Sequence, residues 1–344
     1  MFLAHPGIAK IISKQAEKLI HVSNLFYTIP QVELASLLVE KSFADKVFFG
    51  NSGAEANEAA IKLARKYFSS KGESEKYRII TMKQSFHGRT MATLTATGQD
   101  KIKEGFSPVL PGFDYVPFND INALQKMIGA KTCAVMVEPI QGEGGICIPD
   151  SDYLEKIRTV CDDNKILLIY DEIQTGMGRT GKLFAYENYG VAPDIMTLAK
   201  ALGNGLPIGA MLAKEEVAKA FGPGTHASTF GGTPLVTAAA TEVCKIISDK
   251  NFLKHVREMG TYFKDRLLTL QEKYLIVEQV RGVGLMVGLK LSIEGSQIVD
   301  QCLSKGFVIN CIQGNILRFA PPLIIEKNDI DALVQCLYDI FAQF

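Results

Sequence analysis

The 344-residue sequence lacks an excess of charge of either sign, because 37 Lys and Arg residues are balanced by 37 Asp and Glu residues. Nucleic-acid-binding proteins usually carry a basic excess, so this balance argues against that class. The sequence also lacks an apolar run approaching the ~18–20 residues of a membrane span. Its first residues lack the basic region and apolar run of a signal peptide. We therefore expect a cytoplasmic protein with neither nucleic-acid nor membrane partners.

The sequence lacks the cysteine and histidine patterns of disulfide frameworks and metal sites. Its seven cysteines form no C-x-x-C pair, and such an odd, scattered set is typical of reduced thiols in a reducing compartment. Its five histidines show no H-E-x-x-H or other metal-binding spacing. We expect structural cysteines and no metal site.

What the sequence does have is an alternation of apolar, strand-like runs with amphipathic stretches such as Ala54–Phe68 and Ser151–Asn164. Several runs are apolar throughout, as strands buried on both faces of a parallel sheet must be. The runs are Lys46–Gly50, Tyr77–Met82, Cys133–Val137, Ile166–Tyr170, Asp194–Ala199 and Ile208–Ala213. This alternation predicts an α/β layered domain over residues 1–250, with a largely parallel sheet and an N-terminal helix.

The pattern changes near residue 250, where we expect a smaller C-terminal α+β domain over residues 251–344. Its expected elements are strands within Val277–Leu291, a helix over Ser296–Lys305, and strands at Phe307–Asn310 and Ile316–Phe319. Asn328 or Asp329 is the candidate N-cap of the last helix.

Open α/β sheets bind ligands at the carboxyl ends of their strands, so the residues that follow each strand are candidates for a site. Ser52, Gly53 and Ala54 open a helix whose unpaired N–H groups can bind an anion such as phosphate. The alternative is a plain capping box from Ser52 to Glu55. Asp171 follows another strand, where a buried carboxylate requires a cationic partner, either a structural Lys or Arg or a protonated ring nitrogen.

Lys200 follows the apolar run Asp194–Ala199 and precedes a glycine-rich turn. Desolvation at such a place lowers the pKa of a lysine and frees its amine as a nucleophile, although most lysines are solvated surface residues. Lys200 and Asp171 together supply the Schiff-base lysine and the acidic partner of the ring nitrogen that a pyridoxal-phosphate enzyme needs.

Two glycine motifs approach nucleotide-binding patterns but fail in detail. The segment Gly176–Lys182 has the spacing of a P-loop, but Leu183 stands where the Mg²⁺-binding hydroxyl is required. Gly282, Gly284 and Gly288 have one residue too many for a dinucleotide fingerprint and continue as a strand. A nicotinamide dehydrogenase is therefore disfavoured.

Motifs spread from His21 to Pro322 resemble, in order, those of class III, fold-type I pyridoxal-phosphate aminotransferases, and within that family those of the acetylornithine branch. The matching motifs are Ser23–Thr28, Asn51–Asn57, Ser85–Thr90, Val137–Gly145, Asp171–Gly176, Leu198–Lys200, Ser228–Gly232 and Arg318–Pro322. The resemblance implies a large domain with a mostly parallel, seven-stranded sheet flanked by helices, together with the smaller C-terminal domain. It also implies a homodimer with shared active sites.

The resemblance implies that Lys200 binds pyridoxal 5′-phosphate covalently and moves a proton as general base and acid, while Asp171 keeps the ring nitrogen protonated. The other implied cofactor contacts are Ser52, Gly53 and Ala54 at the phosphate, Phe86 stacked on the ring, Gln174 near the 3′ oxygen, and Thr229 at the phosphate of the neighbouring subunit. The alternatives are ordinary core packing for Phe86 and a turn residue for Thr229.

The resemblance also implies how one site accepts two substrates in turn. Arg89 would bind a carboxylate at the far end of the substrate, and Arg318 would bind the α-carboxylate of glutamate or 2-oxoglutarate. An ω-amine brings no carboxylate to Arg318, so Glu143 would pair with this arginine in one half-reaction and release it in the other. Ser228 completes the implied substrate-binding set. The expected activity is ping-pong transfer of the ω-amino group of N-acetylornithine to 2-oxoglutarate, a step of arginine biosynthesis.

Ornithine, succinylornithine and 4-aminobutyrate remain alternative amino donors, because one sequence does not fix the acyl group. Family members carry further residues before the point that matches His5 and Pro6, and these supply part of the small domain's sheet. We therefore expect weak or no activity relative to a full-length relative, through an exposed strand edge. A catalytically weak or inactive form that acts only as a binding or scaffold protein is the further alternative.

Overall fold

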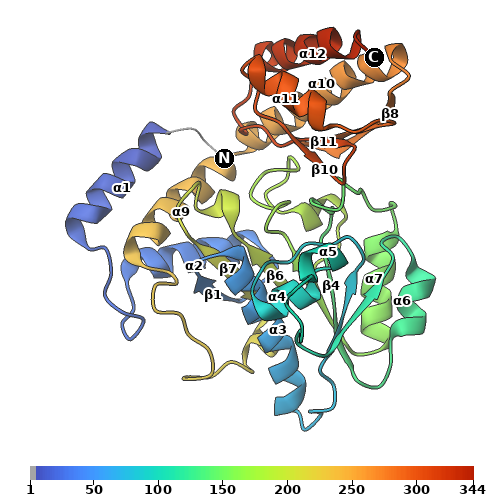
Figure 1. The fold of residues 1–344 in the computed structure, drawn as a ribbon. Helices are drawn as coiled ribbons and strands as arrows, with labels where there is room; N and C mark the ends of the chain where they lie inside the picture. Colours follow the sequence, from blue (N-terminus) through green and yellow to red (C-terminus); the bar gives the residue numbers. More distant parts are fainter. Residues whose placement is uncertain (1–4) are drawn as a thin grey trace.

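The computed structural model describes residues 5–344, and its largest element is a seven-stranded sheet in the order β1-β7-β6-β5-β4-β2-β3 (Figure 1). Only β7 runs antiparallel to its neighbours in this sheet. The strands are β1 (Lys46–Gly50), β2 (Arg78–Met82), β3 (Phe113–Val116), β4 (Thr132–Val137), β5 (Leu167–Asp171), β6 (Ile195–Leu198) and β7 (Gly209–Ala213). The prediction of a mostly parallel, seven-stranded sheet is confirmed.

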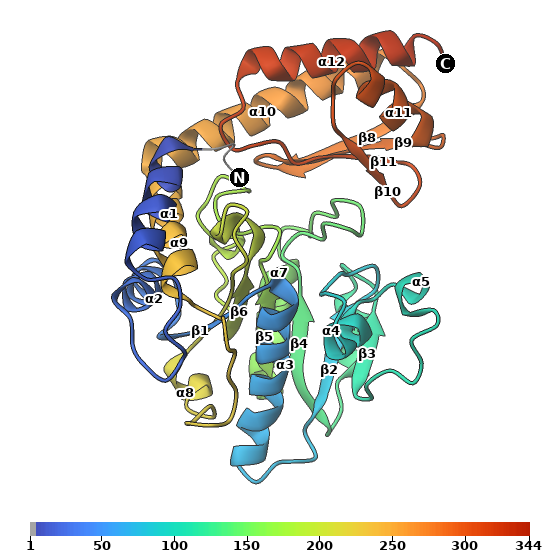
Figure 2. The same ribbon diagram turned by 60° about the vertical axis from the view of Figure 1, so that its left-hand side comes forward.

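Helices cover both faces of this sheet, which explains why its central strands are apolar throughout. Helix α3 (Gly53–Ser70) packs on one face and contacts β1, β4, β5, β6 and β7 (Figure 2). Helices α6 (Ile121–Met127) and α7 (Tyr153–Asp163) pack on the other face. Successive residues of a strand point to opposite faces. Accordingly, Ala134 packs with α3 whereas Val135 packs with α7.

A second sheet, antiparallel and four-stranded, is built from residues after 276 in the order β10-β11-β9-β8. Its strands are β8 (Val277–Val283), β9 (Met286–Leu291), β10 (Asn310–Ile312) and β11 (Ile316–Phe319). Helices α10 (Lys250–Lys273), α11 (Ser296–Ser304) and α12 (Lys327–Phe341) lie on the side of this sheet away from the larger sheet (Figure 2). Sequence reasoning anticipated this strand-rich C-terminal segment, and β11 lies where it was expected.

The two sheets share a continuous apolar core. Helices α1 (Pro6–Lys18) and α2 (Ile29–Lys41) pack on α9 (Pro234–Ile247), and the same buried cluster continues through α10 to α12. The chain passes from α9 to α10 at Ser248 and Asp249, close to the predicted domain boundary. The division into two domains at residue 250 stays a prediction. Among residues 5–344, no helix combines the length and the apolar character of a membrane span.

The strand predicted at Phe307–Asn310 is wrong in position. The Phe307 N–H group donates to the carbonyl of Cys302 at 2.9 Å, so Phe307 still belongs to the turn that ends α11. Val308 is 88% exposed, and the ladder with β11 begins only at Asn310. The apolar character of this segment therefore reflects the end of a helix rather than a strand.

The N-cap predicted for the last helix is also wrong. Glu326 is the N-cap of α12, and Asn328 and Asp329 lie inside its first turn. The Asp329 carboxylate accepts a hydrogen bond from the Glu326 N–H group at 3.1 Å, so it caps the helix from within. Acidic residues are stabilising anywhere in the first turn, which is why residue type alone did not fix the boundary.

Candidate active site

A cavity of about 490 Å³ opens at the carboxyl ends of β1, β5 and β6. It lies where an open α/β sheet is expected to bind a ligand. The structure brings most of the predicted site residues together around it, namely Ser52, Gly53, Ala54, Phe86, Arg89, Asp171, Gln174 and Lys200. These residues come from loops far apart in the sequence.

The amino end of α3 forms one wall of the cavity. The Ser52 hydroxyl accepts a hydrogen bond from the Glu55 N–H group at 3.2 Å, which is one half of the predicted capping box. The other half is not formed, because the Glu55 carboxylate accepts from the Asn51 N–H group instead of that of Ser52. This cap leaves the N–H groups of Gly53 and Ala54 free, because the first turn of a helix offers them no intrahelical partner. Both residues line the cavity, and a Cβ atom at Gly53 would lie 2.8 Å from Cδ1 of Ile173. The capping and anion-binding interpretations are therefore compatible.

Asp171 ends β5 with its side chain only 4% exposed. Its Oδ2 atom accepts a hydrogen bond from Nδ2 of Asn57 at 2.8 Å and lies 2.8 Å from Nδ1 of His87. Its Oδ1 atom accepts from the Ile173 N–H group at 3.0 Å. Within residues 5–344, Asp171 forms no ion pair with Lys or Arg. The alternative that a structural Lys or Arg neutralises this carboxylate is therefore wrong.

Lys200 lies two residues after the end of β6. Its φ is 45°, in the left-handed region that residues other than glycine seldom adopt. Strained backbone of this kind often marks functional sites. Burial by the surrounding protein lowers the pKa of the Lys200 ammonium, while the charges of Asp171 and Glu138 oppose that shift. The side chain is nevertheless accessible from the cavity, and it forms no hydrogen bond or ion pair within residues 5–344. Its amine is thus available to react.

Arg318 and Glu143 are paired, as the resemblance implied. Nη1 of Arg318 in β11 lies 2.5 Å from Oε1 of Glu143, which belongs to the loop after β4. Nε2 of Gln174 lies 3.5 Å from the same carboxylate oxygen, and Nε of Arg318 donates to Asn310 at 3.3 Å. The pair therefore joins the small sheet to the wall of the cavity.

Arg89 and Phe86 lie together on the loop that follows β2. The Arg89 guanidinium is 5.9 Å from the centre of the Phe86 ring, and Arg89 is exposed at the cavity. An exposed guanidinium at this place can bind a carboxylate that enters from solvent.

Ser228 and Thr229 are the predicted residues that the structure does not bring to Lys200 within one chain. They line a neighbouring hollow, where the Ser228 hydroxyl accepts a hydrogen bond from Nδ2 of Asn51 at 3.0 Å. Thr229 is exposed. Asn51 lines both spaces, so the two sites are adjacent.

Sequence reasoning missed three buried polar residues beside the cavity: Asn57, His87 and Glu138. Nδ2 of Asn57 also donates to the carbonyl of His87 at 2.7 Å, so both residues fix the position of Asp171. Glu138 follows a buried strand, which is the signal that drew attention to Asp171. All three occur within the motifs that carried the resemblance.

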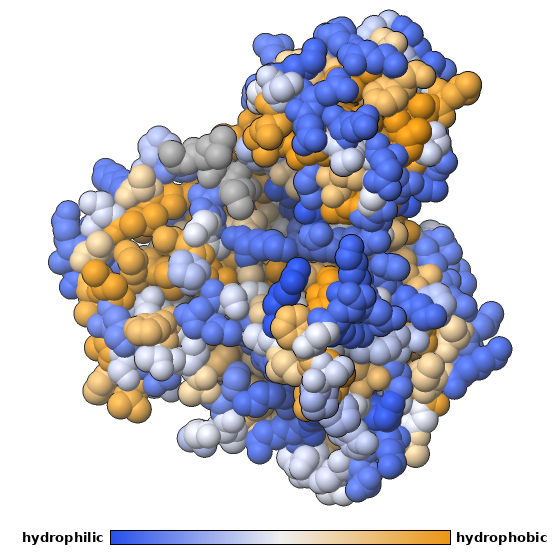
Figure 3. Space-filling model, viewed as in Figure 1, coloured by the Kyte–Doolittle hydropathy of each residue, from blue (hydrophilic) through white to orange (hydrophobic). Residues whose placement is uncertain are grey.

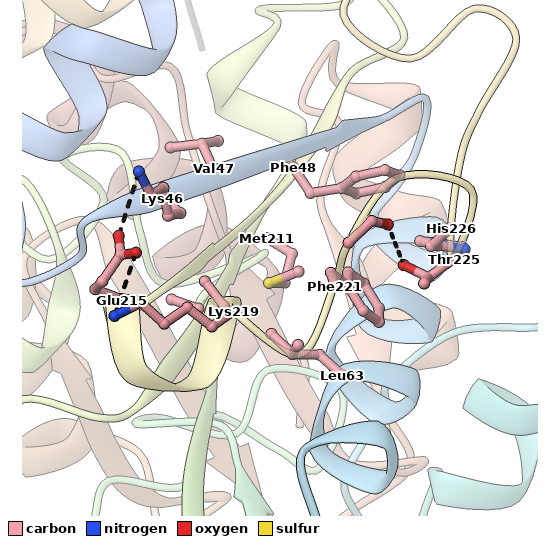
Figure 4. Close-up of a pocket in the computed structure, with 13 residues that line it drawn as sticks. Lys46, Val47, Phe48, Leu63, Met211, Glu215, Lys219, Phe221, Thr225 and His226 are labelled. Carbon is pink, nitrogen blue, oxygen red and sulfur yellow. Dashed lines mark hydrogen bonds and ion pairs between the residues drawn. The ribbon is translucent and has the colours of Figure 1, made fainter. Parts of the chain in front are cut away.

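A second cavity, of about 430 Å³, lies between β1, β7 and α3 (Figure 4). Its apolar lining includes Val47, Phe48, Leu63, Met211 and Phe221. At its rim, Glu215 lies 3.2 Å from Nζ of Lys46 and 3.9 Å from Nζ of Lys219. None of the predicted site residues, all of which fall within residues 5–344, lines this cavity.

A lysine with a lowered pKa and a buried carboxylate at neighbouring strand ends, beside a helix N-terminus, are the features of fold-type I pyridoxal-phosphate transferases. The family model for class III aminotransferases matches residues 3–341, and the chain belongs to this family. It is therefore a transaminase that uses pyridoxal phosphate and acts on amino-acid and keto-acid substrates.

Curated relatives agree with this assignment. An acetylornithine aminotransferase from Methanocaldococcus jannaschii is 55% identical over 339 residues, which are 98% of this chain and 85% of that protein. An acetylornithine aminotransferase from Caldanaerobacter subterraneus subsp. tengcongensis is 54% identical over 98% of this chain and 86% of that protein.

Solved structures share the fold. The ornithine aminotransferase of Toxoplasma gondii superposes with a TM-score of 0.95 at 32% identity, over 99% of this chain and 83% of that one. The N-acetylornithine aminotransferase of Stenotrophomonas maltophilia superposes with a TM-score of 0.86 at 38% identity, over 99% of this chain and 88% of that one. The predicted fold class is thereby confirmed.

Proposed function

We propose that this class III aminotransferase moves the ω-amino group of N-acetylornithine to 2-oxoglutarate, yielding N-acetylglutamate semialdehyde and glutamate. The observation that carries the proposal is the ion pair between Arg318 and Glu143 at 2.5 Å, since an enzyme that alternates between an ω-amine and an α-amino acid needs a cation that can be masked. The relatives described above as acetylornithine aminotransferases support this choice of amino donor.

The residues around the cavity fit pyridoxal phosphate. The free N–H groups of Gly53 and Ala54, with the hydroxyl of Ser52, suit its phosphate. Among residues 5–344, Asp171 forms no ion pair with a Lys or Arg side chain, which leaves its carboxylate for a protonated ring nitrogen. We assign Phe86 and Gln174 to contacts with the ring and Lys200 to the covalent link. When bound, the cofactor supplies an electron sink for the bond broken at the substrate carbon.

The chain's own residues then hold and move the proton. The lowered pKa of Lys200 increases the fraction of free amine, which can take a proton from the reacting carbon and return it on the other side of the reaction. Hydrogen bonds from Asn57 and from the Ile173 N–H group hold the Asp171 carboxylate in one position. A fixed charge needs no reorganisation during the reaction, which favours catalysis.

The gate formed by Glu143 and Arg318 selects between the two substrates. With N-acetylornithine in the cavity, Glu143 satisfies Arg318 and avoids an unpaired cation. With glutamate or 2-oxoglutarate, the substrate's α-carboxylate takes the place of Glu143 and binds the guanidinium through two parallel hydrogen bonds. Arg89 is assigned to the carboxylate at the distal end of either substrate.

We further propose a homodimer in which the active sites are shared. Supporting this, Leu25, Tyr27 and Phe230 are 81%, 94% and 59% exposed, which is unusual for large apolar side chains. The segment that carries Leu25 is tied to the Ser228 loop, because Nδ2 of Asn24 donates to the Ser228 carbonyl at 2.7 Å. Hydrophobic surface also gathers on the side of the molecule where α1, α2 and α9 lie (Figure 3).

The position of Thr229 supplies a functional argument for the homodimer. Thr229 is exposed and does not line its own chain's cavity, but it lines the adjacent hollow together with Asn51, which lines both spaces. A hydroxyl in this place suits contact with the cofactor phosphate in a second copy of the chain. Sedimentation of the purified protein across its concentration range tests the dimer, and a monomer at every concentration would refute it.

A steady-state assay tests the proposed reaction. Glutamate formation from N-acetylornithine and 2-oxoglutarate is measured at several concentrations of each substrate, and a ping-pong mechanism predicts parallel double-reciprocal lines. No glutamate from N-acetylornithine, with turnover of another amine, would move the assignment to that amine.

A further inference from the structure

Glu138 is a buried carboxyl beside the cavity to which the mechanism above gives no role. It directly follows β4 and is 3% exposed. Burial raises its pKa to about 7, while the neighbouring His87 opposes this shift and Asp171 adds to it. Burying a carboxyl is costly unless its oxygens are satisfied, so the interactions of these oxygens indicate its purpose.

Both oxygens of Glu138 accept hydrogen bonds from backbone N–H groups of two different loops. Oε2 accepts from Phe86 at 3.1 Å, and Oε1 accepts from Gly142 at 3.2 Å. Within residues 5–344, no side chain donates to this carboxyl. Glu138 is thus a bridge between two segments of backbone.

The two bridged loops carry the groups that choose the substrate. The loop of Phe86 also carries Arg89, which faces the cavity. Gly142 directly precedes Glu143, the residue that pairs with Arg318. The position of the Glu143 backbone relative to the cavity therefore depends on the bond between Glu138 and Gly142.

Close packing makes this position sensitive. A Cβ atom at Gly142 would overlap the side-chain amide of Gln174, so the loop lies directly against the cavity wall and a side chain there would require Gln174 to move. Gln174 in turn lies 3.5 Å from the Glu143 carboxylate. A displacement of Gly142 would therefore alter the reach of Glu143 toward Arg318.

We infer that Glu138 is a positioning residue of the substrate gate: by holding Gly142 against the Phe86 loop, it sets the geometry in which Glu143 masks Arg318. The inference rests on the proposed alternation between an ω-amine and an α-amino acid. It assigns Glu138 a part in substrate choice that is distinct from the roles of Lys200 and Asp171.

The decisive variant is Glu138→Gln, which keeps the size of the side chain but leaves one oxygen as acceptor. The two half-reactions are followed separately in single turnovers, one with glutamate and one with N-acetylornithine. A loosened gate masks Arg318 less well, so the ratio of kcat/KM for glutamate to that for N-acetylornithine should rise roughly five- to tenfold, the effect of one lost hydrogen bond. An equal change in both half-reactions would overturn the inference.

A double-mutant cycle shows whether Glu138 acts through Glu143. In a Glu143→Gln background, Glu138→Gln should change the ratio little further, because the interaction of residue 143 with Arg318 is already weakened. Multiplication of the two effects would mean independent action and would contradict the inference. Loss of folding is monitored by the visible absorbance of the bound cofactor. If Glu138→Gln does not fold, Glu138→Asp, with the same charge but a shorter reach, must shift the ratio in the same direction, and an unchanged ratio would refute the inference.

Glu172 offers a matched control. It is also buried after a strand and accepts hydrogen bonds from two backbone N–H groups, those of Ala185 and Tyr186 at 2.5 and 2.7 Å. That loop does not carry the gate, so Glu172→Gln should leave the ratio unchanged. An equal shift in Glu172→Gln would mark the effect as general and overturn the inference. If the wild type fails to react with N-acetylornithine, the proposed function fails alone, and the ratio is then measured with an ω-amine that it accepts.

Discussion

Replacing Glu143 by Gln removes the negative charge that masks Arg318 but keeps a side chain of similar shape. In the wild type, Oε1 of Glu143 lies 2.5 Å from Nη1 of Arg318. The side chains are 32% and 19% exposed, respectively, so solvent only partly screens the pair. The amide of Gln can still accept a hydrogen bond from the guanidinium, and the change therefore isolates the contribution of charge.

The size of the effect follows from the difference between charged and neutral hydrogen bonds. Bonds to charged groups contribute about 1.5–3 kcal/mol, whereas neutral ones contribute about 1 kcal/mol. Because solvent only partly screens the pair, we take about 2.4 kcal/mol for the charged bond, near the middle of its range, and the variant then stabilises Arg318 by about 1.4 kcal/mol less, which corresponds to roughly tenfold. Arg318 becomes more available to an α-carboxylate and less well satisfied beside an ω-amine.

Single-turnover absorbance of the cofactor measures each half-reaction. In Glu143→Gln, the ratio of kcat/KM for glutamate to that for N-acetylornithine should rise roughly tenfold over the wild type. The matched control is Glu294→Gln, an exposed carboxyl on another loop, which should leave the ratio unchanged. If Glu143→Gln alters both half-reactions by the same factor, the gate does not exist.

Three further changes test the rest of the site. Lys200→Ala should lower turnover by roughly 10³-fold or more, because Lys200 is the only lysine within residues 5–344 that lines the cavity, while the thermal midpoint changes little; residual turnover near the wild-type rate would remove Lys200 from catalysis. Asn57→Leu deprives the Asp171 carboxylate and the Thr197 hydroxyl of hydrogen-bond partners, so the free energy of unfolding should fall by about 3 kcal/mol and cofactor binding should weaken; unchanged urea unfolding would contradict this. Burial raises the pKa of Glu172 to about 8 from an ordinary 4.5, so its contribution to stability is fully present below pH 4.5 and is lost as pH rises through about 8. The difference in unfolding free energy between the wild type and Glu172→Gln should therefore fall by about 1.4 kcal/mol per pH unit between these values, and parallel curves would refute the shift.

The sequence alone predicted the central strands because their burial on both faces makes them continuous apolar runs. It also placed Asp171 and Lys200 at the carboxyl ends of neighbouring strands, since each residue directly follows such a run. Strand β3 was missed because it has only four residues at the edge of the sheet and includes Asp114, which pairs with Arg78 of β2. A polar residue such as Asp114 fits into this edge strand because it pairs with the neighbouring strand, and the local sequence alone does not show that pairing.

The polar network around Asp171 could not be derived from local sequence. Its contacts with Asn57 and His87 join residues 114 and 84 positions apart, and such long-range pairs depend on the completed fold. The same holds for Glu138, whose function becomes visible only when both of its bridged loops are in place. Local patterns thus located the reactive groups but not the residues that position them.

Thr229 illustrates a different limit. A single chain places it outside the cavity of Lys200, and its proposed contact requires a second copy. The resemblance to a family implied that role, whereas the alternative was an ordinary turn residue.

The most direct test of the central claim is a half-reaction without a keto acid. The purified protein with pyridoxal phosphate is mixed in turn with N-acetylornithine, ornithine, succinylornithine and 4-aminobutyrate, and the loss of the visible absorbance of the lysine-bound cofactor is timed. Our account predicts that N-acetylornithine gives the largest kcat/KM and that the Lys200→Ala variant shows no such absorbance to lose. A larger value for another amine, or no reaction with any of them, would contradict it.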